Sequence, residues 1–170
     1  NTSTVQSNAI LGTDNPDHLA GTAGVDIIVA AGGQDTLDGK EGNDTLNGGA
    51  SVDTAIYSQN LASYLFSAAA NVSSISGPDG SDTLSDIERL QFSDKTLAID
   101  LGAGQAASNT VRIIGAALDA ATIQEHPDYV GIGLDLFDSG LSMLEVSQLV
   151  VDALGDLSNE LFVDTVYQNI

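Results

Sequence analysis

Apolar side chains recur one at a time, at nine-residue intervals, in the first third of the chain. Leu19, Ile28, Leu37 and Leu46 each stand two positions after an aspartate, and Ala55 continues the series. Glycines and polar residues fill most of the intervals. A single apolar residue between polar neighbours suits the middle of a very short strand, because side chains alternate across a strand. The pattern therefore predicts short strands that each point one side chain inward, joined by six-residue loops.

The repeating unit covers residues 12–56 without insertion. A fixed period in which glycine, aspartate and apolar positions are coupled indicates a solenoid of stacked turns rather than a flexible linker. The five turns read GTDNPDHLA, GTAGVDIIV, AAGGQDTLD, GKEGNDTLN and GGASVDTAI. Their sixth positions are Asp17, Asp26, Asp35, Asp44 and Asp53.

The loop composition points to metal chemistry. Glycine permits positive φ, which brings backbone carbonyl groups close to one point, and the aspartate adds a charged oxygen. Calcium is a hard cation that takes about six to eight oxygen ligands, so carbonyls and carboxylates from stacked loops suit it. Besides the five aspartates, we assign to the metal sites Gly21, Gly24, Gly33, Gly39, Gly42 and Gly48.

These turns resemble the RTX, or hemolysin-type, calcium-binding nonapeptide repeat, G-G-x-G-x-D-x-U-x, in which U is apolar. The resemblance implies a parallel β-roll in which two nonapeptides make one coil and calcium lies between loops of neighbouring coils. About three ions would then bind. The implied pairs are Asp17 with Asp35, Asp26 with Asp44, and Asp35 with Asp53. The first and last turns depart most from the pattern, so the loops of Gly21–Asp26 and Gly39–Asp44 form the best candidate pair.

The nine-residue repeat pattern ends before Tyr57, and the sequence after it has a different pattern. Residues 60–67 and 72–77 suit β-strands, and a turn at residues 77–80 follows them. Residues 82–100 resemble the segment G-x-D-x-L-x-x-I-E-x-L-x-F-x-D that commonly follows such repeats, and they would cap the coil, since a bare sheet edge invites aggregation. Asp79, Asp82 and Asp94 could form another cation site there, although turn formation and solvation also explain them. The expected buried face contains Leu84, Ile87, Leu90, Phe92, Leu97 and Ile99.

Helical spacing begins near residue 106. Ser142 and Glu145 form a capping box and Gly140 suits a helix end, so we expect helices over 128–139 and 143–154. Ser158 or Asn159 would cap a last helix. Residues 126–142 resemble part of a helical domain of unknown function that is often attached to these repeats. The expected inner faces are Val111, Ile114, Ala117 and Leu118 in one helix, and Val146, Leu149, Val150, Ala153, Leu154, Leu157 and Leu161 further on.

Charge narrows the range of partners. The chain has 24 Asp and Glu residues against 4 Lys and Arg, a formal net charge of −20 over 170 residues. Such self-repulsion opposes compaction, and bound cations would relieve it. A chain without a basic patch has little to neutralise phosphate groups, so nucleic acid and membrane surfaces are unexpected partners. No apolar run approaches the length of a transmembrane helix.

Cysteine is absent, so metal rather than disulfides would stabilise a secreted fold. The sequence also lacks the motifs of serine hydrolases, zinc proteases and phosphate-binding loops, and we expect no enzymatic activity.

We therefore predict a mainly β protein with a helical C-terminal part: a calcium-binding β-roll over residues 1–57, a β capping segment over 58–104 and a helical region over 105–170. The predicted function is that of a calcium-binding structural module of a secreted or cell-surface bacterial protein, which folds when extracellular calcium binds. Two alternatives stay open: the C-terminal secretion and stabilising region of a type I-secreted enzyme, and a calcium-dependent surface-layer or adhesin assembly piece. The resemblance implies export from a Gram-negative bacterium by the type I secretion machinery, and self-assembly or other cell-surface proteins are further expected partners.

Overall fold

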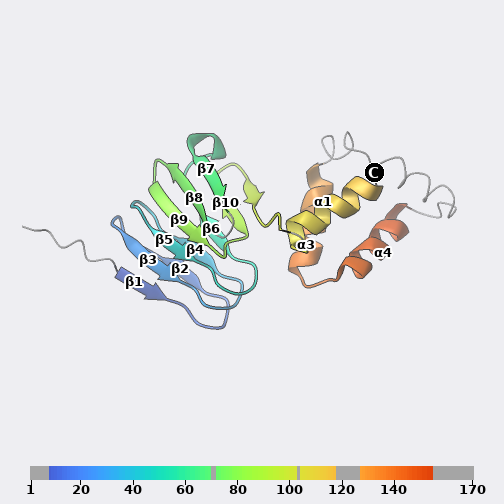
Figure 1. The fold of residues 1–170 in the computed structure, drawn as a ribbon, viewed down its shortest axis with the longest axis horizontal. Coiled ribbons are helices and arrows are strands. Elements are labelled where there is room, and N and C mark those ends of the chain that lie inside the picture. The colour runs from blue at the N-terminus through green and yellow to red at the C-terminus, as the bar shows by residue number, and fades with distance from the viewer. Residues whose placement is uncertain (1–7, 70–71, 103, 118–126, 155–170) are drawn as a thin grey trace, which may run out of the picture. The chain divides into compact units, whose positions relative to one another are not determined.

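The computed structural model describes residues 8–69, 72–102, 104–117 and 127–154 (Figure 1). The chain divides into two compact units, Asn1–Ile99 and Asp100–Ile170. The predicted last helix after residue 157 lies outside the described residues.

Successive repeats of the first unit alternate between two sheets, so two nonapeptides make one coil. One sheet has the order β1-β3-β5-β9-β8-β7 and the other β11-β10-β6-β4-β2 (Figure 1). All pairs between repeat strands are parallel. The strands of the coil are β1 (Asn8–Leu11), which precedes the first repeat, β2 (His18–Ala20), β3 (Asp26–Val29), β4 (Thr36–Asp38), β5 (Thr45–Asn47) and β6 (Thr54–Ile56). This arrangement confirms the predicted β-roll.

The apolar residue at the eighth position of each repeat fills much of the space between the sheets. Ile28, Leu37, Leu46 and Ala55 are each 0% exposed, while their neighbours along the strands are less buried. Identical positions stack on each other, since Leu19 pairs with Leu37 and Ile28 pairs with Leu46 in register. The nine-residue period thus becomes a ladder of buried side chains, as the sequence predicts.

An antiparallel hairpin interrupts the coil after β6. A 3₁₀ helix, η1 (Leu61–Ser63), leads into β7 (Leu65–Ala69), which pairs with β8 (Val72–Gly77). The first part of the strand expected over 60–67 is therefore helical. β8 in turn pairs with β9 (Gly80–Ser85), which lies parallel to β5 and so returns to the coil.

The other sheet also ends in an antiparallel strand. β10 (Arg89–Gln91) runs parallel to β6, and β11 (Thr96–Ala98) is antiparallel to β10. The buried face expected in this segment is confirmed, because Leu84, Ile87, Leu90 and Phe92 join the core and Leu97 and Ile99 pack against it. Aromatic rings widen this end of the core: Phe92 lies 5.7 Å from the ring centre of Tyr57 and 5.3 Å from that of Tyr64.

The second unit contains the described helices α1 (Ala106–Ala117), α3 (Pro127–Asp138) and α4 (Met143–Leu154). The helices predicted over 128–139 and 143–154 are confirmed to within one residue. Gly140 ends α3 with φ of 93°, and the N–H of Leu141 donates to the carbonyl of Leu136 (3.2 Å), as in a Schellman motif.

Parts of the predicted inner faces of the helices are wrong. Val111 is 50% exposed, because the buried face of α1 is formed by Ala107, Thr110 and Ile114 instead. Thr110 is buried against Gly133 of α3, but a prediction from apolar residues alone does not include it because threonine is polar. In α4, Val146 is buried as expected, but Leu149 is 44% exposed.

Ser142→Ala is expected to destabilise α4 by about 1 kcal/mol. The Ser142 hydroxyl accepts from the Glu145 N–H (3.3 Å) and the Ser142 N–H donates to the Glu145 carboxylate (2.8 Å), which confirms the capping box. Helical circular dichroism during urea unfolding measures the change. Ser147→Ala is the matched control, because its hydroxyl bonds the Met143 carbonyl within the helix and alanine favours helix there. Equal losses in both variants would contradict the assigned cap.

Candidate calcium site

The repeat aspartates form two ladders of hydrogen bonds along the coil. In each ladder the backbone N–H of one aspartate donates to Oδ1 of the aspartate one coil further on. The N–H of Asp26 donates to Asp44 in this way at 2.8 Å. On the other side of the coil, Asp17 donates to Asp35 and Asp35 donates to Asp53, both at 2.8 Å. The structure therefore brings together the three pairs of aspartates that the repeat resemblance implies.

These carboxylates are buried, and part of each is left without a partner. Asp26, Asp35, Asp44 and Asp53 are at most 2% exposed. Burying an ionised carboxylate without compensation is strongly unfavourable, so such oxygens call for a ligand. The oxygens of these four carboxylates that lack a hydrogen bond are Asp26 Oδ1, Asp35 Oδ2, Asp44 Oδ2 and Asp53 Oδ2.

The electrostatic cost of burying these carboxylates is reflected in the raised pKa values of Asp44 and Asp53. Desolvation, the largest effect, raises the pKa of Asp53 to about 6, and the charges of Asp35 and Asp86 add to it. Desolvation likewise raises the pKa of Asp44, with added repulsion from Asp26 and Asp38. A backbone N–H hydrogen bond opposes the shift in each case but does not cancel it. The ladder thus holds carboxylates that gain from any added positive charge.

Most of the assigned glycines lie where a side chain would collide with the neighbouring loop. A Cβ on Gly39 would stand 2.5 Å from Asp44 Oδ2, and one on Gly21 would stand 2.6 Å from the carbonyl oxygen of Gly39. Gly42 and Gly48 would meet the carbonyls of Gly24 and Asp86, and Gly33 would meet the backbone of Asn15. Gly24 differs, because a Cβ there would meet only Thr22 Oγ1, at 3.6 Å, so space does not require glycine at this position.

The second position of each loop distinguishes two loop types. In the first two turns this position is threonine: the N–H and hydroxyl of Thr22 donate to Asp26 Oδ2 at 2.6 and 2.9 Å, and Thr13 bonds Asp17 in the same way. In the next three turns it has positive φ, at Ala31 (79°), Lys40 (67°) and Gly49 (97°). Oδ2 of the aspartate is unbonded in those three loops.

Sequence reasoning named Asp82 as a candidate cation ligand but did not place it, or Glu88, in the ladders. The N–H of Asp44 donates to Asp82 Oδ1 (2.9 Å), and the N–H of Asp53 donates to Glu88 Oε2 (2.9 Å). The signal for Asp82 is present in the sequence, because Gly80, Asp82 and Leu84 keep the spacing of a repeat turn. The nine-residue register counted from Asp53 hides it, since an insertion lies between them.

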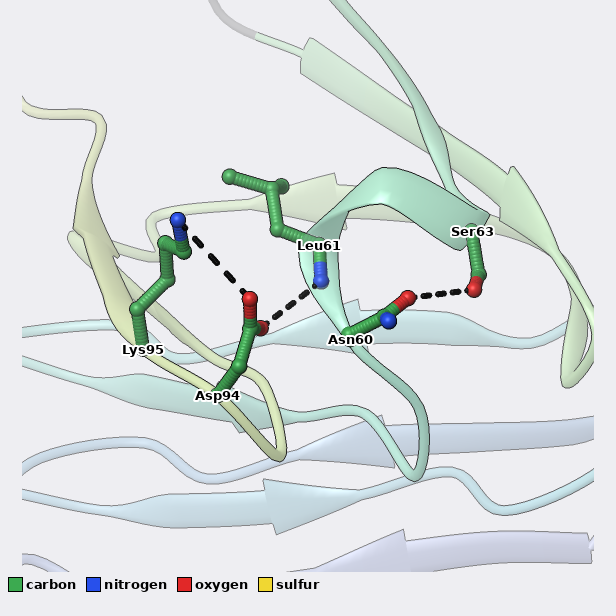
Figure 2. Close-up of polar contacts among 5 residues, drawn as sticks. All are labelled: Asn60, Leu61, Ser63, Asp94 and Lys95. Atoms are coloured by element: carbon green, nitrogen blue, oxygen red, sulfur yellow. Dashed lines mark hydrogen bonds and ion pairs between the residues drawn. The ribbon is translucent and has the colours of Figure 1, made fainter.

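Asp79 and Asp94 do not join Asp82 in a site. Asp79 accepts hydrogen bonds from the Ser58 hydroxyl (2.6 Å) and from the Tyr64 hydroxyl. Asp94 accepts from the Leu61 N–H (2.9 Å) at the start of η1 and lies 3.7 Å from the Lys95 ammonium (Figure 2). The structure therefore gives these two aspartates local structural roles.

No three His, Cys, Asp or Glu side chains gather into a metal-sized cluster within the described residues. A cation here would need backbone carbonyl oxygens as well as carboxylates. The close stacking of the loops supplies such carbonyls, and oxygen-only coordination is typical of calcium. The donor set and the unbonded carboxylate oxygens therefore fit calcium.

Comparison with known proteins defines the class of the first unit. Residues 11–46 and 29–56 match the family model of the RTX calcium-binding nonapeptide repeat (4 copies). The first unit therefore carries RTX repeats arranged as a β-roll. RTX repeats are calcium-binding structural modules rather than catalytic ones, and they occur in secreted proteins of Gram-negative bacteria. The match lies within the repeats, so the predicted likeness of residues 126–142 to a helical domain stays a prediction.

Among solved structures, the chain is similar to the extracellular lipase LipA from Serratia marcescens, with 20% sequence identity and a TM-score of 0.42. The similarity covers 50% of this chain but only 14% of the lipase chain. No curated protein sequence matches the chain. None of the helices among the described residues combines the length and apolar character needed to cross a membrane.

Proposed function

We propose that the β-roll is a calcium-dependent folding module, in which calcium between stacked loops neutralises the buried aspartates. The observation that carries this proposal is the set of four buried carboxylate oxygens without hydrogen-bond partners. In the absence of metal these charges repel one another, so the free energy of metal binding becomes free energy of folding. Bound calcium would supply positive charge and accept oxygen ligands from two loops at once.

The loops that would hold the ions are those of the three aspartate pairs. The pair Gly21–Asp26 with Gly39–Asp44 stays our candidate on one side of the coil. On the other side, the loops that end at Asp35 and Asp53 both have positive φ at their second position and an unbonded Oδ2. These features favour that pair as a complete site. In the loops that end at Asp17 and Asp26, threonine already bonds Oδ2 of the aspartate. Asp26 is buried and keeps an unbonded Oδ1, whereas Asp17 is only partly buried, so the pair of Asp17 with Asp35 is the weaker candidate.

This chemistry suits a protein that works outside the cell. Extracellular calcium modules bind at about 0.1 to 1 mM, far above the free calcium of a cytosol, so the chain would stay unfolded before export and fold afterwards. We propose secretion or surface display by a Gram-negative bacterium through type I machinery. A role as the C-terminal region of a secreted enzyme, or as a surface-layer or adhesin piece, stays an alternative prediction.

Calcium added to the chelated full chain is expected to produce a cooperative gain of β signal in far-ultraviolet circular dichroism. The midpoint should fall at about 0.1 to 1 mM, and magnesium should not reproduce it, because magnesium demands a tighter geometry and gives up water reluctantly. Asp35→Asn together with Asp53→Asn should shift the midpoint to higher calcium, since Asn keeps Oδ1 but lacks the charge. A spectrum that does not respond to calcium would contradict the proposal.

A further inference from the structure

Residues 77–85 repeat the pattern of the nonapeptides after an interruption. Their sequence, GPDGSDTLS, has glycine at the first and fourth positions, aspartate at the sixth and leucine at the eighth. Asp82 follows Asp44 by 38 positions, whereas Asp44 follows Asp26 by 18. The excess of 20 positions equals the length of residues 57–76, which separate the fifth repeat from Gly77. The hairpin is thus an insertion placed between two turns of the coil.

Backbone contacts place β9 as the strand of this displaced turn. Leu46 pairs with Leu84 as Ile28 pairs with Leu46, and Leu84 is 1% exposed. The N–H of Thr83 donates to the carbonyl of Asp44 (2.8 Å), which repeats the bond from Thr54 to Asp35 (2.9 Å). The displaced turn therefore continues the coil with unchanged register.

The loop of the displaced turn stacks like the loops before it. Gly80 has φ of 126°, close to the 146° of Gly42. A Cβ on Gly80 would overlap the carbonyl of Gly42, just as one on Gly42 would overlap the carbonyl of Gly24. Gly42 and Gly80 also form a parallel bridge. The preceding backbone differs, because the chain reaches this loop from the antiparallel strand β8.

One buried carboxylate oxygen beside this loop lacks a hydrogen-bond partner. It is Asp44 Oδ2, and Asp44 is 2% exposed. Tyr57 is 4% exposed, and burial, followed by the charge of Asp82 and a hydrogen bond with it, raises the pKa of Tyr57; the charge of Asp44 adds to the shift. Desolvation similarly raises the pKa of Asp82 to about 6, with repulsion from Asp44 and Asp79. A cation in this region would stabilise the buried carboxylates of Asp44 and Asp82.

We propose that Gly77–Asp82 is the loop of a sixth repeat turn and that it forms, with the Gly39–Asp44 loop, a further calcium site split by the inserted hairpin. This inference rests on the proposed function. Asp44 and Asp82 supply its carboxylates, and the stacked loops supply carbonyl oxygens. The Gly77–Asp82 loop lies outside residues 11–56, which match the repeat model, whereas its partner loop Gly39–Asp44 lies within them. A calcium ion there would link the hairpin and the end of the coil to the regular repeats.

Calcium binding to the full chain, titrated by isothermal calorimetry from a chelated start, tests the split site. Asp82→Asn keeps an Oδ1 acceptor for the Asp44 N–H but removes the charge, and we expect the loss of a single ion from the stoichiometry. Asp94→Asn is the matched control, because Asp94 is an acidic residue of the same segment that bonds Leu61 outside the ladder. Its stoichiometry should equal that of the unaltered chain.

Circular dichroism at saturating calcium establishes that each variant is folded. Should Asp82→Asn fail to gain β signal, Asp82→Glu keeps the charge and the acceptor, and it should bind that ion about tenfold more weakly. If Asp82→Asn folds and binds as many ions as the unaltered chain, or if Asp82→Glu binds them equally well, Asp82 only completes the hydrogen-bond ladder and the split site is wrong. If the unaltered chain binds no calcium, the proposed function itself fails.

Discussion

Leu46→Ala is expected to destabilise the β-roll by about 2 to 5 kcal/mol, the range for leucine truncation in a closed core. Leu46 is 0% exposed and sits between Ile28 and Leu84 in the ladder. Its loss would leave a cavity between Ile28 and Leu84. Because Leu46 is the one fully buried residue of β5, a neighbouring residue in the same strand cannot fill the space.

Urea unfolding at saturating calcium, followed by the β signal, measures the effect of Leu46→Ala as a shift in midpoint. Leu11→Ala is the matched control, because it is the same substitution in the same sheet, at a residue that is 72% exposed. We expect a change within about 0.5 kcal/mol for the control. Similar shifts for both variants would show that the inward ladder does not carry the stability of the coil.

The regular part of the fold could be predicted from sequence because every repeat contains the same residue types at the same positions. The aspartate, the glycines and the single apolar residue recur at one spacing, so the inward ladder of Ile28, Leu37 and Leu46 follows directly from the period. Tight stacking of the loops also follows, since a side chain at Gly39 or Gly42 would collide with a neighbouring loop. Local propensity and tertiary packing agree at these positions.

The displaced turn could not be found from the nine-residue period, because an insertion shifts the later residues out of register. Asp82 and Glu88 take ladder positions that a strict nine-residue register leaves empty. Glu88 is harder still, since its longer side chain reaches Asp53 from a loop that lacks the glycine pattern. The helices show a related limit: Thr110 is buried where a search for apolar residues selects the exposed Val111.

Acid is expected to fold the chelated β-roll partly, as calcium does at neutral pH. The folded coil raises the pKa of Asp53 and of Asp82 to about 6, and that of Asp44 also rises, while an unfolded chain keeps aspartates near about 3.9. The folded state therefore binds more protons than the unfolded state between these values. Its stability without metal is greatest below the unfolded pKa and is lost as pH rises through about 6.

The measurement is the β signal of the chelated chain at pH 5.0 and pH 7.5, both chosen as test conditions around about 6. We expect more β structure at the lower pH, and weaker calcium binding there, because protons and calcium compete for the same oxygens. An unchanged or smaller β signal at low pH would contradict the linkage.

Asp53→Asn separates the two roles of the buried charge. The amide keeps the acceptor that the Asp35 N–H uses, but it carries no charge at any pH. Without metal at pH 7.5, a test condition above about 6, the variant should hold more β structure than the unaltered chain and depend less on pH. With metal it should need more calcium to fold. Asp14→Asn, at an exposed loop residue, should change neither property. If the Asp53 carboxylate serves to bind a cation, this one substitution should stabilise the fold without calcium and weaken calcium-dependent folding. If Asp53 served only as a hydrogen-bond acceptor, neither property would change.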